Sequence, residues 1–205
     1  MAATQRIIDL RKLLAERFQQ QPTLIGEQIN VPLLEGGLRK GAISEIINPN
    51  PSAGSALLIQ NLLQIAQRDR FFLALIDGSD SLDVYDSGAL PHLLWVRCEK
   101  ANEAVKAADF LLRDGNFPLV ILDLVLNPAD ELRRIPATSW YRLQRLVEPT
   151  PTAFVVISRH NMVASARSKI VLENRWSLSD LSRDNPSTQL HFKVRRTKAI
   201  ASATG

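Results

Sequence analysis

Apolar runs of strand length alternate along the chain with stretches of helical periodicity. In the helical stretches, apolar residues recur three and four positions apart, over Ser55–Arg68, Glu103–Arg113 and residues 138–147. Strands that are apolar throughout and separated by helices are typical of a parallel sheet covered on both faces. The pattern therefore predicts an α/β fold, with strands at Ala42–Ile47, Phe71–Ile76, Leu93–Val96, Pro118–Leu126 and Ala153–Ser158.

The two ends of the chain depart from this pattern. Residues 4–18 have the spacing of an amphipathic helix whose apolar face includes Ile7, Leu10 and Leu14. We therefore expect a helical arm over residues 1–22, a core domain over 23–198 and a frayed tail over 199–205. From about residue 165 the core domain should end in basic, half-exposed antiparallel strands, because apolar and polar residues alternate over Ile170–Leu172, Arg175–Leu178 and Leu190–Arg195.

Composition indicates an ordinary soluble protein. The 205 residues are 45% hydrophobic and 22% charged, and no apolar run approaches the roughly 18 residues of a membrane span. The N-terminus does not read as a secretory signal, so we expect a cytoplasmic protein. Cys98 is the single cysteine, which excludes internal disulfides, and its apolar surroundings predict burial.

Positive charge is concentrated in the last third of the chain. Residues 131–205 carry 13 Lys and Arg against 5 Asp and Glu, whereas residues 1–130 carry 12 against 16. Such a distribution favours DNA or an acidic protein as a partner. A solvated basic face without a ligand is the alternative. The candidate binding residues are Arg175, Lys193, Arg195, Arg196 and Lys198.

Residues 45–58 have the outline of a phosphate-binding loop. A loop of this kind, G-x-x-x-x-G-K-[ST], needs glycines for close backbone approach, a lysine on the β- and γ-phosphates and a hydroxyl on Mg²⁺. Only the second glycine, Gly54, is in place. Pro49 stands at the first glycine and has no N–H to donate. Ser55 stands at the lysine and Ala56 at the hydroxyl residue.

Asp123 is the one carboxylate embedded in the fourth apolar run, Pro118–Leu126, and is a candidate metal ligand. With no hydroxyl at Ala56, a metal there would have one protein ligand and no phosphate to bridge. A carboxylate that accepts hydrogen bonds from loop amides is the better interpretation. We expect no zinc site, because the three histidines lack metal-ligand spacing, and no nucleophile at Ser55, which suits a helix N-cap.

Five phrases of the chain carry a family resemblance. They are Glu35–Ile47, Pro51–Gly54 with Ser52, Leu75–Asp83, Leu93–Arg97 and Phe117–Asp123. In this order they resemble the RecA-like recombinase core, and especially the short RecA-like proteins of the ImuA type, over about residues 23–160. The resemblance implies a RecA-like P-loop core with a mostly parallel sheet flanked by helices. It also implies a catalytic glutamate after Asp77 that orients the attacking water, and this chain has Ser79 there.

The resemblance to ImuA implies a role in SOS mutagenesis after DNA damage. Proteins of this type act in translesion synthesis with an ImuB-like protein and an error-prone polymerase. Because Pro49, Ser55, Ala56 and Ser79 remove the nucleotide chemistry, we expect a pseudo-ATPase adaptor with no catalytic residue, cofactor or metal. The arm would bind a partner, RecA or a second copy, and the basic third would bind ImuB-like protein or DNA.

Three alternatives stay open at the level of sequence. The chain could be a weakly active, DNA-dependent RecA-like ATPase that uses Gly54 and Asp123. Related short RecA-like chains resemble the cell-division inhibitor SulA, so a SulA-type inhibitor is the second. The third is a pure DNA-binding module, whose affinity should fall steeply with salt.

Overall fold

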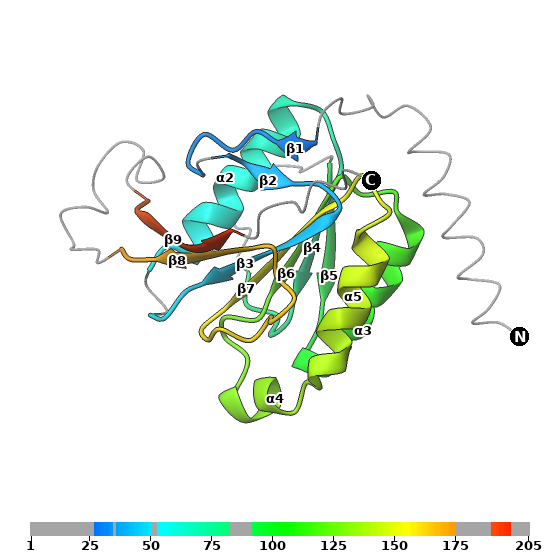
Figure 1. Ribbon diagram of the computed structural model, residues 1–205, viewed down its shortest axis with the longest axis vertical. Coiled ribbons are helices and arrows are strands. Elements are labelled where there is room, and N and C mark those ends of the chain that lie inside the picture. The colour runs from blue at the N-terminus through cyan, green and yellow to red at the C-terminus, as the bar shows by residue number, and fades with distance from the viewer. Residues whose placement is uncertain (1–26, 35, 51–52, 83–91, 175–189, 198–205) are drawn as a thin grey trace, which may run out of the picture.

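A seven-stranded sheet forms the centre of the computed structural model, which describes residues 27–34, 36–50, 53–82, 92–174 and 190–197 (Figure 1). The strand order is β5-β4-β6-β7-β3-β8-β9. All neighbours are parallel except β8 and β9. The predicted α/β fold with a mostly parallel sheet is therefore confirmed. The strands are β3 (Ala42–Ile47), β4 (Leu73–Asp77), β5 (Leu93–Arg97), β6 (Leu119–Asp123), β7 (Ala153–Ser158), β8 (Ser168–Leu172) and β9 (Phe192–Thr197).

Helices cover both faces of this sheet. One face is covered by α2 (Ser55–Arg68) together with a small antiparallel pair, β1 (Gln28–Ile29) and β2 (Leu38–Arg39). The other face is covered by α3 (Ala101–Asp114) and α5 (Ala137–Val147), which lie side by side. The short helix α4 (Ala129–Arg133) lies beyond the end of the sheet (Figure 1).

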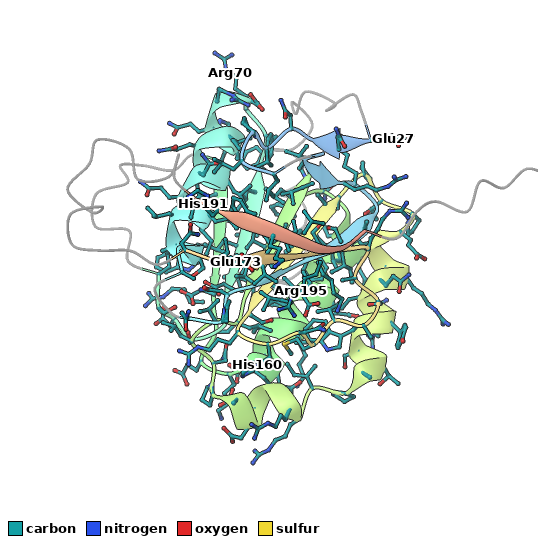
Figure 2. All side chains as sticks on the ribbon, turned by 60° about the vertical axis from the view of Figure 1, so that its left-hand side comes forward. Glu27, Arg70, His160, Glu173, His191 and Arg195 are labelled. Atoms are coloured by element: carbon teal, nitrogen blue, oxygen red, sulfur yellow. The ribbon has the colours of Figure 1, made fainter. Side chains whose placement is uncertain are left out.

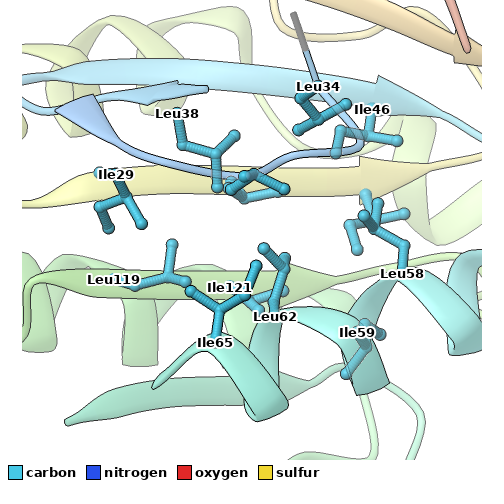
Figure 3. Packing of buried hydrophobic residues seen from close by; sticks show 14 of the residues in the cluster. Ile29, Leu34, Leu38, Ile46, Leu58, Ile59, Leu62, Ile65, Leu119 and Ile121 are labelled. Carbon is cyan, nitrogen blue, oxygen red and sulfur yellow. The ribbon is translucent and has the colours of Figure 1, made fainter. Parts of the chain in front are cut away.

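The apolar character of the strands follows from this layering. Leu119 and Ile121 of β6 belong to the core cluster under α2, where Leu62 and Ile65 face them (Figure 3). Val120 and Leu122, which alternate with them, belong to the cluster under α3 and α5. Since successive strand residues point to opposite faces, a strand buried on both faces is apolar at most positions, and a buried polar residue in it needs a partner.

The prediction for the C-terminal strands was only partly right. β9 is antiparallel to β8, as expected. However, β8 is parallel to β3, and four of its five residues are buried. The strand therefore belongs to the parallel core and is not half-exposed. The segment Arg175–Leu178 lies outside the described residues.

Other differences concern element ends and short elements. The predicted strand Pro118–Leu126 was too long: β6 ends at Asp123, and residues 125–127 form a turn or bend that leads to α4. Pattern reasoning also missed β1, β2 and α4, which have only two, two and five residues. So few positions carry no usable period.

A buried ion pair joins β3 to β8. The Lys169 ammonium lies 2.7 Å from a Glu45 carboxylate oxygen, without the alignment of a hydrogen bond. The other Glu45 oxygen accepts from the backbone N–H groups of Met162 and Val163, at 2.6 and 2.8 Å. Lys169 also donates to Asn161. Lys169, which adds to the basic count of the last third, is therefore internal and does not contribute to a binding surface.

Several predicted features lie outside the described residues. They are the arm with Ile7, Leu10 and Leu14, the loop residue Ser52, the tail over 199–205, and the basic residues Arg175 and Lys198. Cys98 is buried, as expected, and burial raises the pKa of its thiol. Among the helices described, none is long and apolar enough to cross a membrane.

Candidate functional site

The loop of residues 48–54 connects the carboxyl end of β3 to α2. In open α/β sheets, ligands bind outside the carboxyl ends of the parallel strands. Because β4 and β6 run in the same direction as β3, Ser79 and Asp123 lie at this same edge of the sheet. The strand β7 lies between β3 and β6, so the loop and Asp123 do not extend from neighbouring strands.

Asn48 and Ser55 hold the two ends of the loop together. The Asn48 side-chain amide donates a 2.9 Å hydrogen bond to the Ser55 hydroxyl. Asn48 is fully buried and Ser55 is 7% exposed, so this bond lies inside the protein. The Asn48 backbone N–H donates to the carbonyl of Ser158 at the end of β7. Ser55, which stands where the motif has lysine, therefore joins the two ends of the loop through a buried hydrogen bond.

Gly54 keeps a conformation suited to glycine. Its φ of 101° and ψ of 20° place it in the left-handed region, directly before the first residue of α2. No side chain caps the helix at this position. Pro49 and Ala56 are exposed on either side. Pro49 has no backbone N–H to donate, and Ala56 has no side-chain hydroxyl.

Asn174 connects the loop to the last strand of the sheet. Its amide nitrogen donates to the Ala53 carbonyl at 2.8 Å, and its amide oxygen accepts from the His191 backbone N–H at 2.7 Å. Asn174 is buried. The loop is thus held both by β3 and by the segment that leads into β9.

The Asp77 carboxylate organises the segment that follows β4. Asp77 is 2% exposed and accepts hydrogen bonds from the backbone N–H groups of Ser79, Ser81 and Leu82, at 3.3, 2.8 and 2.8 Å. The Ser79 backbone is therefore fixed by a carboxylate of its own segment. Sequence reasoning did not single out Asp77, although an acidic residue directly before Gly-Ser-Asp-Ser is a signal for such a turn.

Asp123 lies beside Asp77 on the neighbouring strand. The two residues are register partners in the β4–β6 pair. One Asp123 oxygen accepts from the Val125 backbone N–H at 3.0 Å, which is the loop-amide bond that we expected of this residue. The pKa of Asp123 is raised to about 6, chiefly by burial and also by the nearby Asp77 charge, against the lowering effect of the Val125 hydrogen bond.

Gly78 and Asn127 lock the ends of β4 and β6 together. The Gly78 N–H donates to the Asp123 carbonyl at 2.9 Å, and the Asn127 amide donates to the Gly78 carbonyl at 2.6 Å. A Cβ on Gly78 would lie 2.4 Å from the Asn127 Oδ1 atom, so only glycine fits there. Sequence reasoning missed Asn48, Asn127 and Asn174. The available signal was an isolated amide next to apolar residues.

The basic candidate residues lie at the opposite edge of the sheet from β5. Lys193 and Arg195 of β9 are exposed, and Figure 2 labels Arg195. The Lys193 ammonium lies 3.8 Å from a Glu173 carboxylate oxygen. The backbone of Arg196 is also part of β9, in register with Lys169. Val194, between Lys193 and Arg195 in the chain, is 50% exposed. The strand therefore presents positive charge and one apolar side chain on its described surface.

The described residues contain no cluster of three or more histidine, cysteine or acidic side chains that could hold a metal. The site thus consists of a closed loop after β3, a carboxylate pair after β4 and β6, and a basic last strand. Ser55 follows β3 and Asp123 ends β6, and these strands are not neighbours, because β7 lies between them. Together with the parallel sheet, this arrangement is consistent with a RecA-like core.

Comparison with known proteins gives the same result at low identity. No protein family matches the chain as a whole. The chain is 32% identical over 103 residues to the protein RecA of Xylella fastidiosa (strain M12), which covers 47% of this chain and 29% of the relative. It is 31% identical over 110 residues to the protein RecA of Xanthomonas euvesicatoria, with 51% and 32% covered.

A further relative is the protein RecA of Borrelia hermsii, 30% identical over 123 residues, or 57% of this chain and 33% of the relative. The matched segment thus spans about a third of the curated relatives' length. The chain carries a RecA-like domain that is distantly and partially similar to RecA proteins.

Proposed function

We propose that this chain is a non-catalytic RecA-like adaptor in translesion synthesis and SOS mutagenesis after DNA damage. Its partners on this proposal are an ImuB-like protein and an error-prone polymerase, with DNA as a further contact. RecA or a second copy would bind through the N-terminal arm. The distant similarity to RecA proteins supports the DNA-repair setting. The residues of the loop after β3 support the proposal that the chain does not hydrolyse ATP, because the motif residues that bind phosphate and metal are missing.

The observation that carries the proposal is the Asn48–Ser55 bond. A nucleotide would need a lysine at position 55, whereas the hydroxyl there is buried and already bonded to the Asn48 amide. Losing one charge-assisted contact costs about 1.5–3 kcal/mol. Loss of the lysine, the hydroxyl at Ala56 and the N–H at Pro49 together corresponds to about 10³-fold or more in affinity. ATP is therefore not expected to bind tightly.

A second candidate function is a weakly active RecA-like ATPase. Gly54 keeps its left-handed conformation, and Asp123 stands at the edge of the sheet with a raised pKa. These features support a residual nucleotide site. The serine at position 79 and the missing lysine weigh against it.

Calorimetry of the full chain with ATP and Mg²⁺ separates the two functions. The adaptor proposal requires no binding at micromolar nucleotide and no phosphate release above background with or without single-stranded DNA. A dissociation constant in the micromolar range or tighter would overturn it. A RecA protein, measured in the same buffer, serves as the positive control.

The partner is tested by co-purification from cells with and without DNA damage. The proposal requires an ImuB-like protein and a polymerase to be recovered with the chain under damage. Recovery of a cell-division protein instead would favour the SulA-type alternative. Replacing Lys193 and Arg195 by glutamine should weaken recovery if the basic strand makes the contact, because both side chains are exposed.

A further inference from the structure

A groove follows the seam between α3 and α5, on the face of the sheet opposite α2. Hollows of about 540 and 160 Å³ lie along it, and a third of about 490 Å³, lined by α5 alone, adjoins the second. Asn102 lines the first and the second, and Ser139 and Arg142 line the second and the third. The hollows are therefore neighbours. They form one groove, which begins at the turn between α4 and α5 and continues along α5.

The lining of the groove includes apolar side chains. Ile135 and Pro136 line the first hollow, Val105 and Leu143 the second, and Leu146 the third. Hollows lined in part by apolar side chains are typical of the centre of a protein interface.

Positive charge surrounds this apolar lining. Lys100, Lys106, Arg134, Arg142 and Arg145 all line one or more of the hollows. Within the described part of the chain, no carboxylate lies within ion-pair distance of Lys100, Lys106 or Arg145. Three cations are thus available to a partner.

The two acidic residues of the groove are already engaged. Asp109 lies between two arginines, 2.9 Å from Arg113 and 2.7 Å from Arg142. Glu131 accepts a 3.0 Å hydrogen bond from the Ala101 N–H at the start of α3. The Asp109 charge is therefore offset by two arginines, and Glu131 is held at the start of α3. Five cationic side chains line the hollows against these two carboxylates, so the groove offers a partner a positive potential.

We propose that this groove binds an acidic amphipathic helix of a partner protein. The 11 residues of α5 make a helix of about 16 Å at about 1.5 Å per residue. A partner helix of about three turns would match that length. Its apolar face would fill the hollows, and glutamates or aspartates on its flanks would meet Lys100, Lys106 and Arg145. A nucleic acid fits less well, because phosphates gain nothing from an apolar lining.

This inference does not depend on the adaptor proposal. The groove is built from α3, α4 and α5, whereas the emptied loop lies between β3 and α2 on other elements. The chain could fail to act in translesion synthesis and still bind an acidic helix. The experiment below therefore uses no nucleotide, DNA damage or cell extract.

The test is a fluorescence-anisotropy titration of the full chain against labelled synthetic peptides. The main probe is a helical peptide of about 14 residues, with leucine every three or four positions and glutamate between them. A shuffled peptide of the same composition tests the apolar face, and a lysine version tests the charge. An oligothymidine of similar length tests nucleic acid. We expect the acidic amphipathic peptide to bind at least about tenfold tighter than the shuffled and lysine peptides.

Two substitutions locate the binding. Lys106→Glu and Arg145→Glu, both at exposed positions, should each lower the affinity for the acidic peptide about fivefold or more. Arg70→Glu, at the end of α2 (Figure 2), is the matched control and should leave binding unchanged. Far-ultraviolet circular dichroism verifies that each variant is folded.

Three results would overturn the inference. The first is equal binding of the acidic and shuffled peptides, or no binding of either. The second is oligothymidine binding that depends on Lys106 and Arg145 while the peptide does not bind, which would make the groove a nucleic-acid site. The third is a change in the oligomeric state of the chain on Arg145→Glu without peptide binding, which would make the occupant a second copy.

Discussion

The amide of Asn48 donates a hydrogen bond of 2.9 Å to the hydroxyl of Ser55, across a loop that in the RecA-like pattern would surround phosphate. Both side chains are buried. The bond turns the beginning and the end of the loop toward each other. A serine at this position is therefore part of the internal structure of the loop.

We expect Asn48→Ala to destabilise the protein. The substitution removes the donor to Ser55 at a fully buried position, which should cost about 1–3 kcal/mol in the free energy of unfolding. Urea denaturation followed by circular dichroism measures the loss. Asn50→Ala, at an exposed position of the same loop, is the control and should cost less than about 0.5 kcal/mol. Equal effects of the two substitutions would contradict the role of the bond.

Restoring the missing loop chemistry should restore nucleotide affinity. The triple variant Pro49→Gly, Ser55→Lys and Ala56→Thr regains an N–H, a charge and a metal ligand on a loop where Gly54 already has the required conformation. We expect ATP affinity to rise at least about tenfold over the natural chain, measured by calorimetry with Mg²⁺. The control replaces lysine by methionine, which has similar length and no charge. Unchanged affinity would show that the loop frame is no longer a nucleotide site.

Asp123 should make stability depend on pH. Its pKa is about 6 in the folded chain, against an ordinary value of 3.8. Between these values the folded chain binds more protons than the unfolded chain, so the free energy of unfolding falls as pH rises from about 4 to about 6. The Asp123→Asn variant has no carboxylate to titrate here, so it should not lose stability in this way. Its amide oxygen can still accept the hydrogen bond from the Val125 backbone N–H. Relative to the natural chain, the variant should gain about 1–3 kcal/mol between pH 4 and pH 7.

Denaturation at several pH values tests this prediction. Asp130→Asn, at an exposed position on α4, is the control and should show no such gain. If the Asp123→Asn variant loses stability in parallel with the natural chain over this range, the raised pKa does not contribute to folding.

Gly78→Ala should be more damaging than an ordinary glycine substitution. The new Cβ would lie 2.4 Å from the Asn127 Oδ1 atom and 2.7 Å from the Asp123 carbonyl, and the carbonyl belongs to a central strand. We expect a loss of about 2–3 kcal/mol, measured by thermal unfolding. Gly36→Ala separates collision from strain, because its φ is +79° but nothing lies within 4 Å of its Cβ. It should cost about 1 kcal/mol, and an equal loss at both sites would refute the collision.

The stability of the protein should depend on both members of the buried Glu45–Lys169 pair. Lys169→Ala leaves the Glu45 carboxylate buried without its cation, which should cost about 3–5 kcal/mol. The double variant Glu45→Gln, Lys169→Met removes both charges and should cost less than the single one. Urea denaturation of both variants checks the order. A double variant less stable than the single would contradict it.

The sequence determined where two of the central strands begin and end. β3 and β7 begin and end at the predicted residues, because Gly41 and Asn48 flank the first run and Thr152 and Arg159 flank the second. The direction of β8 could not be derived in this way. Its parallel partner β3 lies more than 100 residues earlier in the chain, at Ser44 opposite Ser168. An alternating pattern indicates which face is buried and does not indicate which strand lies alongside.

The same limit applies to the candidate site. The positions Gly54, Ser55 and Asp123 could be read from spacing, since the loop and the strand around them are local features. The hydrogen bonds of Asn127 and Asn174 could not, because they join residues 49 and 121 positions apart. The counterion of Lys169 was hidden for the same reason. Charge counts alone placed that lysine on the surface.

Asn174 gives the protein a direct mechanical connection between its two candidate regions. One side-chain amide holds the Ala53 carbonyl in the loop and the His191 N–H before β9 at the same time. A partner that displaces the start of β9 must break the second bond and release the amide that holds the first. A partner that bound the basic strand in this way would therefore also alter the shape of the loop, without touching the loop itself. The loop after β3 would then respond to what the last strand contacts.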